Sequence, residues 1–162
     1  MKILFIQTGG TIDKDYPKTK NGWAFEINEP AVKRILEKVN CSFNHSVISL
    51  LKKDSLEIND EDRSLILSKC KKAKESKIII THGSDTMNIT GNYLKEIKNK
   101  TIIITGAMRP ERFSNSDADV NLGVAIGAVQ SLSNGIYIAM NGLVIPHNKV
   151  KRDKDNGQFI FK

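Results

Sequence analysis

The chain has 162 residues, of which 40% are hydrophobic, and its formal net charge is +7 at pH 7. This length can bury one ordinary hydrophobic core but hardly two, so we expect a single domain over residues 1–162. The lysines are spread along the chain without interleaved aromatic residues, which favours a solvated basic surface and argues against nucleic acid as a partner.

Membrane and metal-binding classes also find no support in the sequence. No stretch approaches the roughly 18 apolar residues of a membrane-spanning helix, and the amino-terminal residues lack a signal peptide's apolar core. Cys41 and Cys70 have no metal-like spacing, and the histidines are not spaced as ligands beside acids. Free thiols are typical of a reducing compartment, so we expect a soluble cytoplasmic protein without membrane contact, metal or cofactor.

Short runs rich in isoleucine and valine alternate along the chain with stretches of helical periodicity. The predicted strands cover residues 3–6, 46–51, 77–81, 101–105 and 135–140. Four helices are predicted. The first begins near Pro30, and the second runs from near Asp60 to about Lys74. The third follows Asp85, and the fourth runs from Ser116 or Asp117 to Leu132. We expect apolar faces made by Ala31, Val32, Ile35, Leu36 and Val39 on the first helix and by Val120, Leu122, Val124, Ala125 and Val129 on the last.

This alternation predicts an α/β fold, a doubly wound and mostly parallel sheet flanked by helices. Functional groups in such a sheet lie at the carboxyl ends of the strands. Each predicted strand is followed by hydroxyl groups, acids or glycines, so we expect a polar cleft at that edge. The segments concerned are residues 8–11, 53–55, 81–85, 106–110 and 141–142.

The first polar segment, TGGT at residues 8–11, fits several functions when taken alone. It lacks the spacing and lysine of a phosphate-binding loop and the third glycine of a dinucleotide fingerprint. A plain turn would explain the glycines but neither threonine. The second segment, THGSD at residues 81–85, ends a strand and opens a helix whose free N–H groups can hold an anion, although a simple helix cap by Ser84 or Asp85 would look the same.

Three motifs together resemble the bacterial-type L-asparaginases. They are TGGTI at residues 8–12, HGSDTM at 82–87 and TGAMRP at 105–110, in the family's order, and the likeness extends from Met1 to about Lys154. The resemblance implies that Thr11 is a nucleophile that attacks the side-chain amide of L-asparagine, or of glutamine or a related small amide. Ammonia then leaves an acyl-enzyme, which water hydrolyses to the acid.

The resemblance also implies roles for other residues. Tyr16 matches a tyrosine partner of the nucleophile, Ser84 replaces the family's second catalytic threonine, and Asp85 matches the acid that binds the substrate's α-ammonium group. Ser55 falls where a serine holds the α-carboxylate, although a loop cap explains it equally well. With Gly10, Gly83 and Ala107, Ser55 completes the predicted substrate-binding set.

Two departures from the family pattern leave alternatives open. The family's second-triad lysine aligns without gaps to Arg152, and a shift of one residue would place Lys151 there. Family members continue into a second domain that supplies cleft residues to a neighbouring subunit, so we expect a homodimer or higher oligomer. The apolar tail is predicted to form an edge strand or to contact a partner; its residues are Phe159, Ile160 and Phe161.

Two alternative functions also fit the sequence. One is an amino-acid-binding module without turnover, and the other is an amidase subunit that acts on a larger amide.

Overall fold

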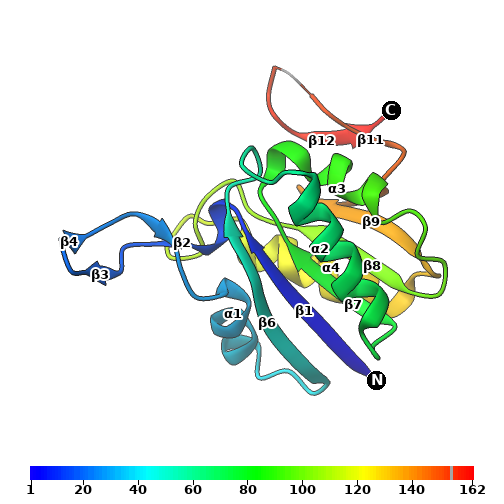
Figure 1. Ribbon diagram of the computed structural model, residues 1–162, viewed down its shortest axis with the longest axis horizontal. Coiled ribbons are helices and arrows are strands. Elements are labelled where there is room, and N and C mark those ends of the chain that lie inside the picture. Colours follow the sequence, from blue (N-terminus) through cyan, green and yellow to red (C-terminus); the bar gives the residue numbers. More distant parts are fainter. Residues whose placement is uncertain (154) are drawn as a thin grey trace.

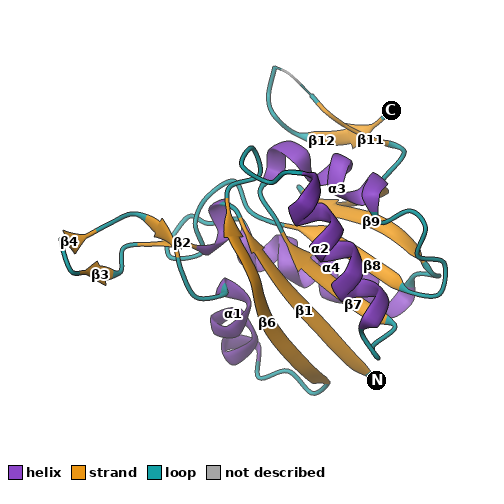
Figure 2. Ribbon diagram, viewed as in Figure 1, coloured by secondary structure: helices purple, strands orange, loops and turns teal. Residues whose placement is uncertain are grey.

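A six-stranded sheet forms the centre of the computed structural model, which describes residues 1–153 and 155–162 (Figures 1 and 2). The strand order is β10-β9-β8-β7-β1-β6. All neighbours pair in parallel except β10, which runs antiparallel to β9. The strands are β1 (Lys2–Gly9), β6 (Asn44–Lys53), β7 (Lys77–Thr81), β8 (Thr101–Thr105), β9 (Gly135–Met140) and β10 (Leu143–Pro146).

Helices cover both faces of this sheet. The helices are α1 (Ala31–Val39), α2 (Asp60–Lys72), α3 (Met87–Tyr93) and α4 (Ala118–Ser131), with 3-10 turns η1 (Thr11–Asp13) and η2 (Ser84–Thr86). Buried side chains of α2 and α3 share one hydrophobic core with one face of the sheet, and those of α1 and α4 share the other. The predicted doubly wound, mostly parallel α/β fold in a single domain is therefore confirmed.

The central strands follow directly from their isoleucine content. Ile78 and Ile80 of β7 enter one core and Ile79 enters the other, and each is fully buried. Strand β8 repeats this alternation, with Ile103 opposite Ile79. Branched side chains suit a pleated strand covered on both faces, so a continuous apolar run folds here without a polar face.

Helix α2 begins where its polar residues predict. The Asn59 side chain accepts a hydrogen bond from the Asp62 N–H, and the Asp62 side chain accepts one from the Asn59 N–H. Acidic residues occupy the first turn and lysines the last, an order that favours the helix dipole. The helix ends at Lys72, two residues before the predicted end.

Two predicted core residues are wrong. Val39 is 59% exposed and Val120 is 62% exposed. Val39 lies in the last turn of α1, where the chain leaves the helix through Asn40 in a left-handed conformation with φ of 48°. Val120 lies on the side of α4 away from the buried stripe formed by Ala118, Leu122, Ala125 and Val129.

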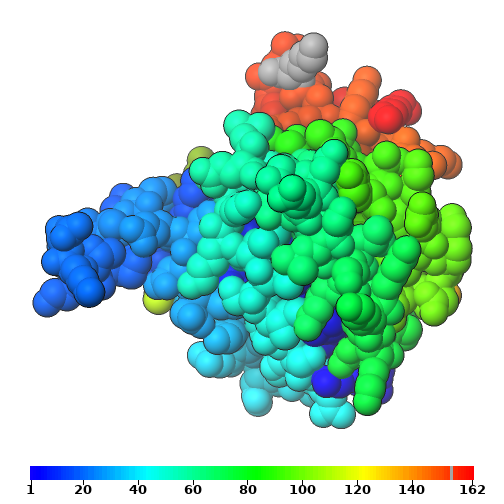
Figure 3. Space-filling view, viewed as in Figure 1, coloured from blue at the N-terminus to red at the C-terminus, as the bar shows by residue number. Residues whose placement is uncertain are grey.

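A projecting arm and a C-terminal hairpin extend from the body. The arm of residues 14–27 contains β2 (Lys14–Asp15) paired with β5 (Glu26–Ile27), and β3 (Lys18–Thr19) paired with β4 (Gly22–Trp23). It projects from the molecule, as Figure 3 also shows. The C-terminal hairpin pairs β11 (Val150–Arg152) with β12 (Phe159–Phe161), so the predicted tail strand has its partner within the chain. Among the described residues, no helix combines the length and apolar character that crossing a membrane requires.

Candidate active site

Three polar loops meet at the carboxyl edge of the sheet because two glycines let their backbones touch. Gly10 has φ of 86°, and a Cβ atom added there would lie 2.3 Å from the Gly83 nitrogen. A Cβ atom on Gly83 would lie 2.7 Å from the Ser55 Cβ. No side chain fits at either position, so the loops after β1, β6 and β7 form one continuous surface.

Hydrogen bonds hold the loop after β1 in this place. The Gly10 N–H donates to the Lys53 carbonyl oxygen at 3.0 Å, and the Thr8 hydroxyl donates to the Thr81 carbonyl oxygen at 2.7 Å. Thr8 is fully buried, so its hydroxyl has a structural task. Thr11 is half-buried at the start of η1, and within the described residues its hydroxyl forms no hydrogen bond. The two threonines of the motif therefore have different surroundings.

Asp85 is the centre of a small polar cluster in this surface. Its Oδ2 atom accepts a hydrogen bond from the Ser55 hydroxyl at 3.1 Å, and its own N–H donates to the Ser55 oxygen at 3.3 Å. Its Oδ1 atom contacts Nη1 of Arg152 at 2.5 Å. The structure thus brings together Ser55, Asp85 and Arg152, which are far apart in the sequence. Ser84, half-buried, precedes Asp85 at the start of η2.

Of the two candidates for the family's lysine position, it is Arg152 that contacts Asp85. Both residues lie in β11, where neighbouring side chains point to opposite sides of the strand. The Arg152 Nε–H also donates to the Gly157 carbonyl oxygen at 3.0 Å. Lys151 is exposed.

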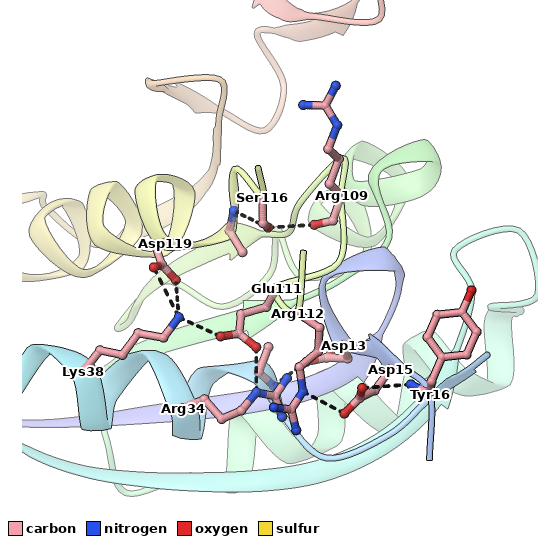
Figure 4. Close-up of polar contacts among 12 residues, drawn as sticks. Asp13, Asp15, Tyr16, Arg34, Lys38, Arg109, Glu111, Arg112, Ser116 and Asp119 are labelled. Carbon is pink, nitrogen blue, oxygen red and sulfur yellow. Dashed lines mark hydrogen bonds and ion pairs between the residues drawn. The ribbon is translucent and has the colours of Figure 1, made fainter. Parts of the chain in front are cut away.

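Tyr16 is not brought to Thr11 in this structure. It lies on the projecting arm, 54% exposed, and its ring packs against Phe25 with the centroids 4.7 Å apart. The neighbouring Asp15 accepts a hydrogen bond from Nε of Arg112 at 2.8 Å (Figure 4). No hydrogen bond joins Tyr16 to Thr11 among the residues described.

Ala107 lies in the loop after β8, which packs on the loop after β7. A Cβ atom on Gly106 would lie 2.3 Å from the His82 carbonyl oxygen, and Ala107 is 3% exposed. The Asp117 carboxylate accepts hydrogen bonds from the N–H groups of Met108 and Arg109, each at 3.0 Å. Asp117 thus positions this loop, a role that its place at a helix start does not reveal.

His82 supports the loop from beneath. It is fully buried, with Nδ1 2.8 Å from the Gly83 carbonyl oxygen and Nε2 2.8 Å from the Thr90 hydroxyl. Burial lowers the pKa of His82 to about 4, because the charged ring would lose its hydration. The imidazole is therefore neutral near pH 7.

Asp13 is a buried acid in the 3-10 turn that begins at Thr11, and the sequence analysis did not identify it. Its Oδ1 atom accepts from the Ala31 N–H at 2.8 Å and its Oδ2 atom from the Thr81 hydroxyl at 3.3 Å. Burial raises the pKa of Asp13 from 3.8 to about 6, although these hydrogen bonds oppose the shift. Asp13 joins η1 to the first turn of α1.

This pKa shift predicts a specific pH dependence of stability. Because Asp13 titrates near 3.8 when unfolded and near 6 when folded, the folded state binds more protons in this interval. The contribution of Asp13 to the free energy of unfolding should therefore fall by about 2 to 3 kcal/mol as the pH rises from about 4 to about 6.5. Urea unfolding of wild type and Asp13→Asn at several pH values measures it.

The comparison with Asp13→Asn controls for other titrating groups. Because His82 titrates in both proteins, its effect cancels from the difference between their free energies of unfolding. Asparagine can still accept from the Ala31 N–H through its amide oxygen. Parallel stability curves of the two proteins between these pH values would contradict the assignment.

A buried ion cluster ties the segment after β8 to α1 (Figure 4). Glu111, whose side chain is 4% exposed, accepts from Nε of Arg34 at 2.6 Å and from Nζ of Lys38 at 2.8 Å. Burial is the largest single influence on the pKa of Glu111 and raises it, but the hydrogen bonds and charges of Lys38 and Arg34 together hold that pKa below its usual range. The cluster holds the chain directly after the TGAMRP segment against α1.

Two further observations bear on ligands. Among the described residues, no three histidine, cysteine, aspartate or glutamate side chains gather as metal ligands would. A hollow of about 440 Å³ beside α1, lined by residues that include Leu36, Cys41 and His45, does not include the three loops. The candidate site is therefore assigned from its side chains and backbone contacts.

Comparison with known proteins places these features in a family. The family model described as "Asparaginase, N-terminal" matches residues 2–161. The L-asparaginase of Thermococcus kodakarensis is 30% identical over 168 residues, which cover 100% of this chain and 51% of that protein. A glutaminase-asparaginase of Acinetobacter glutaminasificans is 25% identical over 162 residues, covering 93% of this chain and 49% of that protein.

Solved structures agree with the sequence comparisons. The structure of the thermostable L-asparaginase from Thermococcus kodakarensis superposes with a TM-score of 0.83 at 29% identity, covering 99% of this chain and 51% of that one. The chain spans about half the length of the curated relatives it matches. On the match over residues 2–161 and the three motifs at the sheet edge, the chain belongs to the asparaginase family, in the part that the N-terminal model describes.

Proposed function

We propose that the protein hydrolyses the side-chain amide of L-asparagine, or of glutamine or a related small amide, to the acid and ammonia. One observation carries the proposal: Gly10 and Gly83 bring the loop of Thr11 against the loop of Ser84 and Asp85, with Ser55 beside them. A hydroxyl, a second hydroxyl and an acid on one rigid edge suit acyl transfer. Membership of the asparaginase family supports the same reaction.

In this reaction the Thr11 oxygen attacks the amide carbonyl carbon. The carbon–nitrogen bond then breaks, and the hydroxyl proton ends on the departing nitrogen, which leaves as ammonia. Water attacks the resulting ester of Thr11 and releases the acid. Ser84 is the second hydroxyl beside the reacting carbon, while Ser55 and Asp85 hold the end of the substrate that carries the α-substituents. Gly10, Gly83 and Ala107 line the substrate.

Arg152 has a different task from a general base. A guanidinium keeps its proton in proteins, so it cannot accept one from Ser84 or water. Its contact with Asp85 orients that carboxylate. A group other than Arg152 must therefore accept the proton in the proposed reaction.

Ammonia release from the purified protein tests the function directly. We expect release with asparagine and, separately, with glutamine, measured by a coupled dehydrogenase assay under conditions where the protein is folded by circular dichroism. A folded protein that releases ammonia from neither amide would overturn the proposal.

One observation favours a second candidate, an amino-acid-binding module without turnover. Asp85 is already paired with a cation that cannot act as a base. Calorimetry that detects L-aspartate binding, together with no ammonia release, would support the module. Absence of any binding would exclude it.

We also propose an assembly of two or more copies in the cytoplasm. Large apolar side chains stand exposed: Leu56, next to Ser55 in the sequence, is 79% exposed, and Trp23 on the arm is 73% exposed. Burial of such surface favours association. Both cysteines are free thiols, which suits a reducing compartment. Sedimentation equilibrium would report the number of copies, and a monomer at micromolar concentration would contradict the assembly.

A further inference from the structure

We infer that Asn141 is a positioning residue, whose side chain holds the C-terminal hairpin in the place that brings Arg152 against Asp85. The inference deepens the proposed function and rests on it, because it concerns how the substrate-binding end of the same site is kept in order. Asn141 itself lies in the turn between β9 and β10, outside the loops after β1, β6 and β7.

The backbone of this turn explains why asparagine and glycine stand there. Asn141 and Gly142 form a two-residue turn, in which Met140 of β9 pairs with Leu143 of β10. Their φ angles are 53° and 79°, and the commonest two-residue hairpin turn needs positive φ at both positions. Asparagine and glycine adopt this conformation most readily. Glycine would form the turn at residue 141 equally well, so the asparagine side chain can be removed without strain.

The side chain of Asn141 reaches the C-terminal hairpin. Its Oδ1 atom accepts a hydrogen bond from the Phe159 N–H at 3.0 Å. Phe159 pairs directly with Arg152 across the two strands of that hairpin, so the bond acts at the register position of Arg152. Strands β11 and β12 form a sheet of their own. Contacts with the body of the protein, such as this one, therefore decide where the C-terminal hairpin lies.

The backbone of Asn141 is itself tied to the core. Its N–H donates to Oδ1 of Asn121 at 3.2 Å, and Asn121 is 2% exposed. The Asn121 Nδ2 atom donates to the Gly106 carbonyl oxygen at 3.0 Å and to the Asp117 carboxylate at 2.8 Å. One set of hydrogen bonds thus joins the C-terminal hairpin, α4 and the loop after β8.

The contact between Arg152 and Asp85 needs such a frame. The two side chains are 35% and 43% exposed, and an ion pair in contact with solvent adds little stability of its own. An arginine side chain also loses rotamer freedom when it stays in one place. Its Nε–H donates to the Gly157 carbonyl oxygen at 3.0 Å, which ties the side chain to its own hairpin. How well Arg152 orients Asp85 therefore depends on where that hairpin lies.

Asn141→Gly tests the inference, because it removes the side-chain acceptor and keeps the turn. The Phe159 N–H should then exchange with solvent deuterium about fivefold faster, the factor that corresponds to one hydrogen bond. The KM for asparagine should also rise about fivefold, since Asp85 holds one end of the substrate, while kcat and the midpoint of urea unfolding change little. A substitution that merely unfolded part of the protein would lower kcat and leave KM unchanged.

Three further variants sharpen the test. Asn141→Asp keeps an acceptor oxygen and should retain the wild-type KM. Asn40→Gly makes the same change at another asparagine with positive φ, 48° at the end of α1, and should alter neither KM nor exchange at Phe159. In an Arg152→Gln background, Asn141→Gly should change KM by less than twofold, because the group that it positions is gone. A fivefold rise in that background would show that Asn141 acts by another route and would overturn the inference.

Calorimetry with L-aspartate separates this inference from the proposed function. The affinity should fall about fivefold in Asn141→Gly, and if it does so in a protein that releases no ammonia, the function alone is overturned. Hydrolysis with unchanged KM and unchanged affinity would overturn the role of Asn141 and leave the function intact. An unchanged exchange rate at Phe159 would also overturn that role. If wild type neither hydrolyses asparagine nor binds L-aspartate, both fall.

Discussion

Thr11→Ala is expected to lower the rate of ammonia release by at least about a thousandfold and to leave the melting temperature almost unchanged. Loss of the proposed nucleophile would remove the covalent route, and effects of this size are usual for such residues. Thr11 is half-buried and its hydroxyl forms no hydrogen bond within the described residues, so its removal should cost less than about 1 kcal/mol of stability. Steady-state rates and thermal unfolding of the same preparation measure both effects.

Thr8→Ala is the matched control, because the same change three residues earlier removes a structural hydroxyl. The Thr8 hydroxyl donates to the Thr81 carbonyl oxygen inside the core. Its loss should destabilise the protein by about 1 to 3 kcal/mol by leaving that buried carbonyl unpaired. A Thr11→Ala protein that keeps its rate, or loses it only through unfolding, would refute the nucleophile assignment.

The sheet and the location of the site follow from local features of the sequence. The isoleucine runs at 78–80 and 102–104 specify buried strands, and parallel strands must end at the same edge. Polar loops after those strands therefore meet, whatever their sequence separation. Ser55 and Asp85 lie 30 residues apart and are joined by a hydrogen bond.

Features that depend on pairing between distant segments could not be predicted. Whether Lys151 or Arg152 faces Asp85 depends on the register of a three-residue strand, set by pairing of Val150 with Phe161. A shift of one residue would turn the other side chain toward the site. The arm that carries Tyr16 consists of two-residue strands, which leave no periodic pattern to recognise.

The burial and the raised pKa of Asp13 could not be predicted from the sequence either. An acid that directly follows an apolar residue carries no signal that it is buried. Its burial results from contacts with Ala31 and Thr81, 18 and 68 residues away. Its raised pKa is thus a property of the fold, and it lies only two residues from Thr11.

The close approach of Gly10 to Gly83 predicts the second large effect. In Gly10→Ala the added methyl group would lie 2.3 Å from the Gly83 nitrogen, and φ of 86° is strained for alanine. We expect the free energy of unfolding to fall by about 2 to 4 kcal/mol. We also expect the rate to fall by about a hundredfold or more, because displacement of a reacting group by about 1 Å has effects of that size. Urea unfolding and ammonia release measure the two losses.

Gly123→Ala makes the same chemical change as Gly10→Ala but is expected to raise the stability instead of lowering it. Gly123 lies on the exposed side of α4, and a Cβ atom there would meet nothing within 4 Å. Alanine should stabilise this helix by about 0.5 to 1 kcal/mol and leave the rate unchanged. If Gly10→Ala behaved like Gly123→Ala, the two loops would not depend on backbone contact. The contact at Gly10 matters because it fixes where the Thr11 oxygen stands relative to Ser84 and Asp85, and any reaction at this edge depends on that placement.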